Sequence, residues 1–210
     1  SLNVADSRAS VVAVIFSSNP IFVFLFSAII DKERIEIKKV IGLIAGLAGI
    51  LTIFMDKLDI TAISYKSPLL ALLSAAFYGL YTVIGRKLSL RVGSLKMNAY
   101  SFITGSLVLL PVLFFLRIPV VSFDYSALYK VAYLALFVSG VAYLTYFKGL
   151  AIVGASSGSL MFFIKPVLAS LIAIIFLHEN LTVSLIAGTA LIIAGIAAVV
   201  GIKAPGKKLE

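Results

Sequence analysis

The sequence is dominated by seven long apolar runs separated by short polar breaks. A helix needs about 20 apolar residues to cross the hydrocarbon core of a bilayer. Lipid also requires every backbone polar group to be paired within its own segment, which favours helices over isolated strands. The runs therefore predict an all-α polytopic membrane protein with seven transmembrane helices in this chain. They cover residues 9–30, 38–55, 67–85, 97–117, 127–148, 155–177 and 181–202.

Composition supports lipid as the surrounding medium and excludes several classes of protein. Hydrophobic residues make up 61% of the chain and charged residues 13%, whereas a soluble domain is about half apolar and a quarter charged. The chain has no Cys and one His, His178. We therefore expect no disulfide, no thiol chemistry, no metal site and no cofactor. The net charge is +9, but the basic residues form short clusters rather than one face, so we expect no nucleic-acid partner.

The basic residues are distributed unequally between the two ends of the runs. Twelve Lys and Arg fall on one side, five fall on the other, and Lys165 belongs to neither. Cytoplasmic loops carry the excess of basic residues. We therefore expect a multi-pass protein of the cytoplasmic (inner or plasma) membrane, with the C-terminus inside and residue 1 outside. An extracytoplasmic start without a signal peptide leads us to expect further helices upstream.

The chain matches itself without a gap when it is shifted by 146 residues. Residues 9–50 share eleven identities with residues 155–196. Pro, Glu and Gly punctuate helices, so their shared register indicates a repeat rather than chance similarity. The two equivalent helices, the first and the sixth, are five spans apart, an odd number, so we expect the two units to be inverted, as in many secondary transporters. The matched pairs are Pro20 and Pro166, Glu33 and Glu179, Gly42 and Gly188, and Gly49 and Gly195.

The repeat also predicts the domain organisation. The later unit has three spans before its proline-containing span, so we expect three upstream helices and a ten-helix parent of two inverted sets of five. We accordingly assign residues 1–57 to the last two helices of the first repeat and 58–66 to a connecting loop. Residues 67–202 form the complete second repeat, and 203–210 are a cytoplasmic tail or vector-derived residues.

The spacing of proline, glutamate and glycine resembles that of a known family. It occurs as Pro20, Glu33 and Gly42 and again as Pro166, Glu179 and Gly188. This double pattern is similar to the EamA-type family of the drug/metabolite transporter superfamily, over residues 5–201. The resemblance implies two inverted five-helix halves and transport of a small metabolite or amino acid, with export the commoner activity. The chain departs from the family at Lys32 and His178, where members commonly have a small residue before the glutamate.

Lys165 is the strongest candidate for a functional residue. It lies midway along the run 155–177, where a lysine costs about 2.5–3.5 kcal/mol on insertion scales and usually faces the bundle interior or a watery cavity. No Asp or Glu lies deep in any run. We predict that the ammonium meets an anionic or zwitterionic substrate, or that its protonation is coupled to transport. The alternative is a structural pairing with polar groups of another helix.

Other polar side chains share helical faces with one another. Ser74 and Tyr78 share a face of the third run, and Ser139 and Tyr143 share one of the fifth. We predict that these four, and Asn19 as the counterpart of Lys165, line the same cavity. For Glu33 and Glu179 we favour a structural role, in which each carboxylate caps helix amides. For Gly42 and Gly188 we expect close helix packing.

These observations favour a secondary carrier that works by alternating access on a small-molecule substrate. A membrane module without transport activity remains an alternative. A membrane enzyme is disfavoured because no cluster of His, Cys or carboxylate groups is present. Proton coupling and a homodimer stay open.

Overall fold

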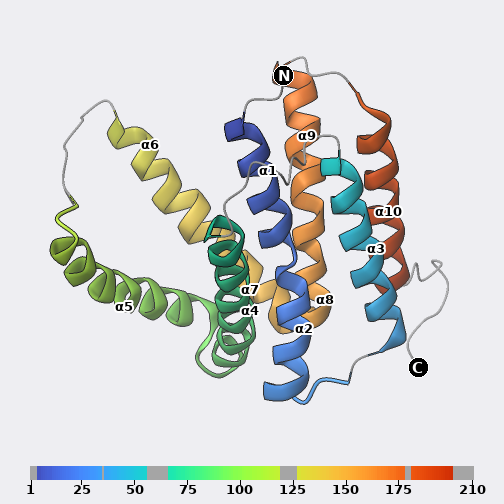
Figure 1. Cartoon of the computed structure of the whole chain (residues 1–210). Coiled ribbons are helices and arrows are strands. Elements are labelled where there is room, and N and C mark those ends of the chain that lie inside the picture. Colours follow the sequence, from blue (N-terminus) through green and yellow to red (C-terminus); the bar gives the residue numbers. More distant parts are fainter. Residues whose placement is uncertain (1–3, 35, 56–65, 119–126, 178–180, 201–210) are drawn as a thin grey trace. The chain divides into compact units, whose positions relative to one another are not determined.

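The computed structural model describes residues 4–34, 36–55, 66–118, 127–177 and 181–200 (Figure 1). The described residues form helices and no strands. Two compact units can be distinguished, one of residues 1–83 and 155–210 and one of residues 84–154. The α-helices are α1 Val4–Ser17, α2 Asn19–Ile30, α3 Ile37–Phe54, α4 Lys66–Val92, α5 Ser94–Phe115, α6 Leu128–Tyr133, α7 Ala142–Val153, α8 Ala155–Ser159, α9 Ile164–Leu177 and α10 Val183–Val200. The π-helix η3 is Leu134–Val141, and the 3-10 helix η4 is Leu160–Phe163.

The helices follow the apolar runs of the sequence. Six helical segments of the described chain are long and apolar enough to cross a membrane, and Val183–Val199 is a shorter apolar helix. The all-α polytopic class is therefore confirmed. Many large apolar side chains are exposed, among them Phe114, Phe115 and Ile152, as expected of a surface that lipid covers.

Two helix boundaries differ from those expected from polarity. α4 continues past the expected end at residue 85 to Val92, because Lys, Arg and Leu are good helix formers and basic side chains can extend toward the membrane surface. It stops at Gly93, whose φ of 86° favours glycine. α7 likewise continues past the expected end at residue 148 to Val153, and it stops at Gly154, which has a φ of 90°. Gly149 and Gly158 are inside helices.

The two proline-containing spans are each broken rather than continuous. Ser18 separates α1 from α2, and the 3-10 turns of η4 separate α8 from α9. Pro20 and Pro166 lie in the first turn after each break, as the second residue of α2 and the third of α9. Proline has no amide hydrogen to continue a preceding helix, but it is well tolerated at a helix start. Each proline of the repeat therefore lies at the start of a helix, although each falls inside a single apolar run of the sequence.

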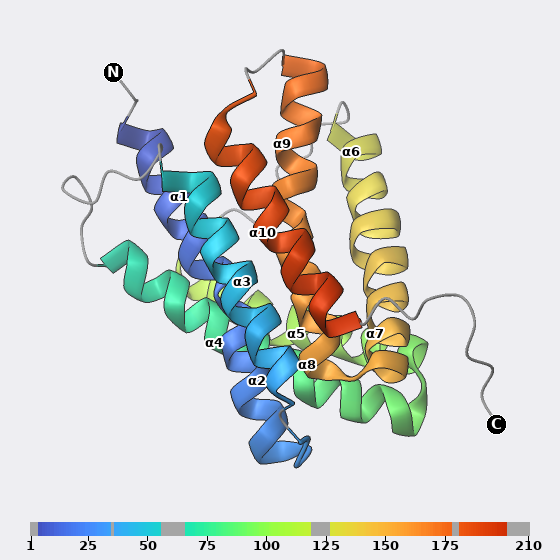
Figure 2. The ribbon, with the colours of Figure 1, turned by 90° about the vertical axis from the view of Figure 1, so that its right-hand side faces the viewer.

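The helices α3 and α10 pack against each other through their glycines. Figures 1 and 2 show the pair side by side from two directions. Gly42 faces Gly195 and Gly49 faces Gly188, so the two helices run antiparallel. A Cβ atom at Gly49 would lie 2.6 Å from the carbonyl oxygen of Gly188, and one at Gly42 would lie 2.8 Å from that of Gly195. Only residues without a side chain allow this approach.

The core of this first unit lies beside the glycine contact. Phe163 of η4 is fully buried, and a Cβ atom added at Gly46 would collide with its ring. The main cluster of buried apolar residues consists of Phe24, Ile50, Ile53, Leu160, Phe163, Val167 and Ile192. It joins α2 and α3 to the broken span η4–α9 and to α10. Leu160 and Phe163 of η4, the break in the second proline-containing span, are thus packed against residues of α2, α3 and α10.

The second unit is built around Phe147 of α7. Its ring is fully buried, and a Cβ atom added at Gly85 of α4 would collide with this ring and come close to Met97 of α5. Arg86 donates its Nε hydrogen to the carbonyl oxygen of Leu150 at 2.8 Å, near the end of α7. A basic group favours the negative end of a helix dipole. Between α6 and α7, the π-helix η3 was not expected from sequence.

Candidate functional site

Lys165 lies directly after the break in the second proline-containing span. It is the second residue of α9, and its side chain is exposed. Its Nζ atom lies 3.8 Å from the centroid of the Phe162 ring, in the preceding 3-10 turn. This is a cation–π contact. Glu33 forms an ion pair with Lys39, and no described carboxylate forms one with Lys165.

Four aromatic residues, Phe16, Tyr78, Tyr81 and Phe162, form one group in the first unit, here termed the aromatic cluster. Tyr78 is at its centre. The Tyr78 and Phe162 centroids are 5.3 Å apart with planes at 81°, and those of Tyr78 and Phe16 are 5.9 Å apart with planes at 61°. Tyr81 lies 6.0 Å from Tyr78. Lys165 therefore rests on a group of edge-to-face rings, an arrangement that aromatic pairs prefer.

The aromatic cluster joins the two helix breaks of the unit. Phe16 lies in the last turn of α1 before Ser18, and Phe162 lies in η4 before α9. The two phenylalanines are 146 residues apart and so occupy the same position of the sequence repeat. Neither phenylalanine was predicted as a site residue. The signal was present in their identity at equivalent positions, but nothing in the sequence indicated that both rings contact Tyr78.

Asn19 is held differently from Lys165, its counterpart in the repeat. Its side chain is fully buried, and its Nδ2 atom donates to the carbonyl oxygen of Ala75 in α4 at 3.0 Å. Its Oδ1 atom has no partner among the described residues. Ala75 precedes Tyr78 by three positions, so Asn19 contacts the helical face that carries Tyr78. One member of the pair thus binds a neighbouring helix, while the other is exposed.

The remaining predicted cavity residues are divided between the two units. Ser74 is exposed on α4, one turn before Tyr78. Ser139 lies in the π-helix η3 of the second unit and is half-buried. Tyr143, also of the second unit, packs edge-on against Phe102 with centroids 5.4 Å apart. Within the first unit the structure therefore brings together Lys165, Tyr78 and, through α4, Asn19.

Glu33 is at the centre of a hydrogen-bonded group that also contains Ser27, Lys39 and Ser156, here termed the Glu33 network. Lys39 donates to Oε1 of Glu33 at 2.7 Å, and the hydroxyl of Ser156 donates to Oε2 at 2.9 Å. The Ser156 and Ser27 hydroxyl oxygens are 2.8 Å apart. Ser156 has one hydroxyl hydrogen and gives it to Glu33, so Ser27 is the donor in that contact. The network joins the α2–α3 connection to α8.

The carboxylate of Glu33 thus binds the side chains of Lys39 and Ser156, and the backbone amide of Ser156, in the first turn of α8, also stabilises its charge. Burial raises the pKa of Glu33, but the hydrogen bonds from Lys39 and Ser156 outweigh it, so the pKa lies below its usual value. Its predicted counterpart, Glu179, lies outside the described residues. Gly42 and Gly188 lie at the α3–α10 contact described above.

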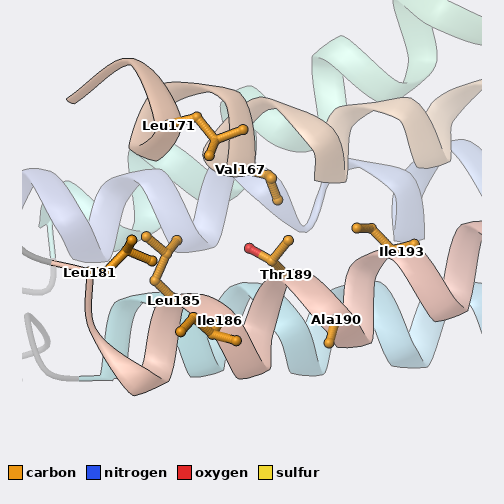
Figure 3. A pocket seen from close by; sticks show the side chains of 8 residues that line it. All are labelled: Val167, Leu171, Leu181, Leu185, Ile186, Thr189, Ala190 and Ile193. Carbon is orange, nitrogen blue, oxygen red and sulfur yellow. The ribbon is translucent and has the colours of Figure 1, made fainter. Parts of the chain in front are cut away.

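An apolar groove of about 270 Å³ runs between α9 and α10 (Figure 3). Val167, which lines the groove, is two residues after Lys165 and therefore points about 200° away from it around α9. The groove thus lies on a different side of α9 from Lys165 and the aromatic cluster beneath it. The one hydroxyl in its lining belongs to Thr189. We assign it no role in binding a polar ligand. Its lining residues are Val167, Leu171, Leu181, Leu185, Ile186, Thr189, Ala190 and Ile193.

Comparisons with known proteins agree with this architecture. The model of the EamA-like transporter family matches residues 3–55 and 66–201. A crystal structure of a protein superposes with a TM-score of 0.75, covering 94% of this chain and 69% of that chain, at 22% identity. At that identity the likeness concerns the fold alone.

Several curated relatives are themselves named transporters. An uncharacterized transporter of Clostridium kluyveri is 31% identical over 91% of this chain and 63% of its own length. The uncharacterized transporter YoaV of Bacillus subtilis is 30% identical over 88% of this chain and 64% of its own. A relative from Archaeoglobus fulgidus, also an uncharacterized transporter, is 30% identical over 91% and 68%. The chain thus spans less than two thirds of the length of the first two.

Proposed function

Because this chain belongs to the EamA-like transporter family, we propose that it forms the larger part of a secondary carrier for a small metabolite. The carrier works by alternating access between two inverted halves. The observation that carries the proposal is the meeting of the two helix breaks at Tyr78, beside the exposed ammonium of Lys165. Broken helices near the middle of the membrane are a recurrent way of building a substrate site in such carriers.

The glycine contact supports the inverted repeat. Adding 146 to Gly42 gives Gly188, and adding 146 to Gly49 gives Gly195. The contact between Gly42 and Gly195 therefore becomes the contact between Gly188 and Gly49 when the two units are exchanged. A pair of contacts that exchange in this way is expected of units related by a two-fold axis. The parent would then have ten helices, three of them before residue 1.

The symmetry also gives a reason for the exposure of Lys165. α4 packs closely on the face of α2 that carries Asn19 and Phe22. Asn19 donates to the carbonyl oxygen of Ala75, and a Cβ atom added at Gly79 would lie 2.7 Å from the Cβ atom of Phe22. The matching residues of α9, Lys165 and Leu168, are exposed. In the parent, a helix equivalent to α4 would approach this face. Lys165 would then lie between helices, where a substrate can reach it.

We assign substrate contact first to Lys165 and Tyr78, and then to Asn19 and Ser74 of the same unit. Ser139 and Tyr143, of the second unit, stay predicted cavity residues. Loop charge supports a cytoplasmic C-terminus in the cytoplasmic membrane, and export is the direction we propose. The family and the names of the relatives indicate a non-enzyme.

Transport by reconstituted vesicles tests this function. Labelled amino acids, sugars and organic anions are loaded, and their release is followed with and without an imposed pH gradient. We expect Lys165→Met to reduce transport at least about tenfold, which corresponds to 1.4 kcal/mol, and Lys165→Arg to retain part of it. Lys148→Met, in the second unit, is the matched control and should transport normally. Equal, full transport by both Lys165 variants would contradict the assignment of Lys165.

A further inference from the structure

The charges of the described spans select against a substrate that carries an ammonium group. None of the six long segments or the helix Val183–Val199 contains an Asp or Glu. A cationic group near Lys165 would therefore meet a like charge and no carboxylate of these segments. Like-charge contact is an effective way to reject a competing ligand. An anionic group would instead meet an exposed ammonium.

The ammonium of Lys165 can leave the Phe162 ring and bind an arriving anion. The ammonium rests on the face of Phe162, and a ring face is a weaker partner for an ammonium than a carboxylate is. An arriving carboxylate would take the ammonium from the ring without breaking an ion pair first. The cation–π contact thus keeps the charge beside the helix break when no anion is bound.

The two halves of the repeat offer only one such charge. Asn19 stands where Lys165 stands in the second half; its side chain is neutral, and its Nδ2 atom already donates one hydrogen to Ala75. The site therefore suits one anionic group per ligand. A dianion would find no second ammonium at the position of Asn19, and an unpaired charge out of water is costly.

The aromatic cluster adds a preference for the body of the ligand. Phe16 and Tyr78 are half-buried, and they continue the row of rings that begins at Phe162 under Lys165. Rings of this kind favour a flat apolar group that can join them edge-to-face or stacked. A sugar-like body, with a hydroxyl on most carbons, would lose hydrogen bonds with water there.

We infer that the site of the proposed carrier takes an organic monoanion with a flat apolar body, such as an arylcarboxylate, in preference to a zwitterion or a cation. This inference rests on the proposed function and names the substrate class of the same site. Lys165 binds the carboxylate, and the aromatic cluster contacts the body.

Four probes separate the contributions of charge and ring. Phenylacetate, phenylalanine and phenethylamine share a ring and differ in charge, while acetate has the charge without the ring. Binding to the purified protein in nanodiscs of neutral lipid is measured by calorimetry near neutral pH. We expect phenylacetate to bind at least about tenfold more tightly than each of the other three. Equal or tighter binding of phenylalanine or phenethylamine, or no binding of any probe, would overturn the inference.

Variants assign the preference to residues. Lys165→Met should remove the preference for phenylacetate over phenethylamine, and Lys165→Arg should keep it, with both checked for monodispersity. Phe162→Leu should weaken the binding of phenylacetate by a larger factor than the binding of acetate. Lys148→Met, in the second unit, should match the unsubstituted protein. If Lys165→Met still prefers phenylacetate, the inference is contradicted. If the vesicles instead transport phenylalanine in a way that depends on Lys165, the substrate class is wrong but the proposed carrier function is not contradicted.

Discussion

The Glu33 network makes a testable contribution to stability, and Ser156 is the residue that best isolates it. The hydroxyl of Ser156 is 1% exposed and is hydrogen-bonded to Glu33 and Ser27. Replacing Ser156 with alanine removes a hydrogen bond to a charged acceptor, which is worth about 1.5–3 kcal/mol. Ser27 keeps an acceptor, since its hydroxyl also lies 3.1 Å from the carbonyl oxygen of Phe24. We therefore expect a destabilisation of about 2 kcal/mol.

Ser159→Ala is the matched control for this substitution. Ser159 is fully buried on the same helical segment, but its hydroxyl donates only to the carbonyl oxygen of Ser156 at 2.8 Å. Losing such a local bond should cost less than about 1 kcal/mol. Unfolding is followed by heating in detergent, where 1 kcal/mol corresponds to about 2–4 °C for a chain of this size.

A double-mutant cycle separates the network from general effects of the substitutions. Combined with Glu33→Ala, Ser156→Ala should show a coupling free energy of about 1–2 kcal/mol, within the range seen for residues in one hydrogen-bond network. If Ser156→Ala and Ser159→Ala were equally stable, or if the cycle gave no coupling, the hydrogen bond to Glu33 would contribute nothing and the reasoning would fail.

Three further predictions concern other contacts. Gly49→Ala would place a Cβ atom 2.6 Å from a carbonyl oxygen of α10 and should lower the unfolding temperature clearly. Gly105 lies in open space, so Gly105→Ala is the control and should be neutral or stabilising by up to about 1 kcal/mol. Equal effects of the two substitutions would contradict the α3–α10 packing. Asn19→Ala should cost about 1–3 kcal/mol, because the buried amide loses its bond to α4, and an unchanged unfolding temperature would show that this bond is not formed. The pKa of Glu33 is lowered in the folded state, so the stability that its carboxylate contributes is complete above its usual pKa and is lost as the pH falls through the folded value. Lowering the pH from neutral to about 3 should therefore reduce the unfolding temperature of the unsubstituted protein more than that of Glu33→Gln. Parallel curves of unfolding temperature against pH would refute this.

The helices could be predicted because lipid reduces the choice of structure. Runs of about 20 apolar residues admit little other than a helix, so the class and the approximate spans followed from the sequence. The break at Ser18, the 3-10 turns before Lys165 and the π-helix η3 could not be located in this way. A proline within an apolar run is compatible with a kink, a break or a helix start, and tertiary packing decides among them.

The candidate site could be predicted only where one residue differed in chemical type from all of its neighbours in the sequence. Lys165 was recognisable because a charge in an apolar run is costly. Phe162 was not, because a phenylalanine there is unremarkable until its ring is seen beneath an ammonium. The role of Glu33 was predicted as structural, but its partner Ser156 is 123 residues away, and no local pattern encodes a bond over that separation.

The inverted repeat is the basis of the proposed carrier, and single-cysteine labelling tests it most directly. Glu36 and Thr182 are 146 residues apart, both are exposed, and each lies directly before the first residue of its helix, α3 or α10. The chain has no native cysteine, so Glu36→Cys and Thr182→Cys can be labelled separately with a membrane-impermeant maleimide. We predict that Glu36→Cys reacts only from the cytoplasmic side and Thr182→Cys only from the opposite side. Reaction of both from the same side would contradict the inverted architecture.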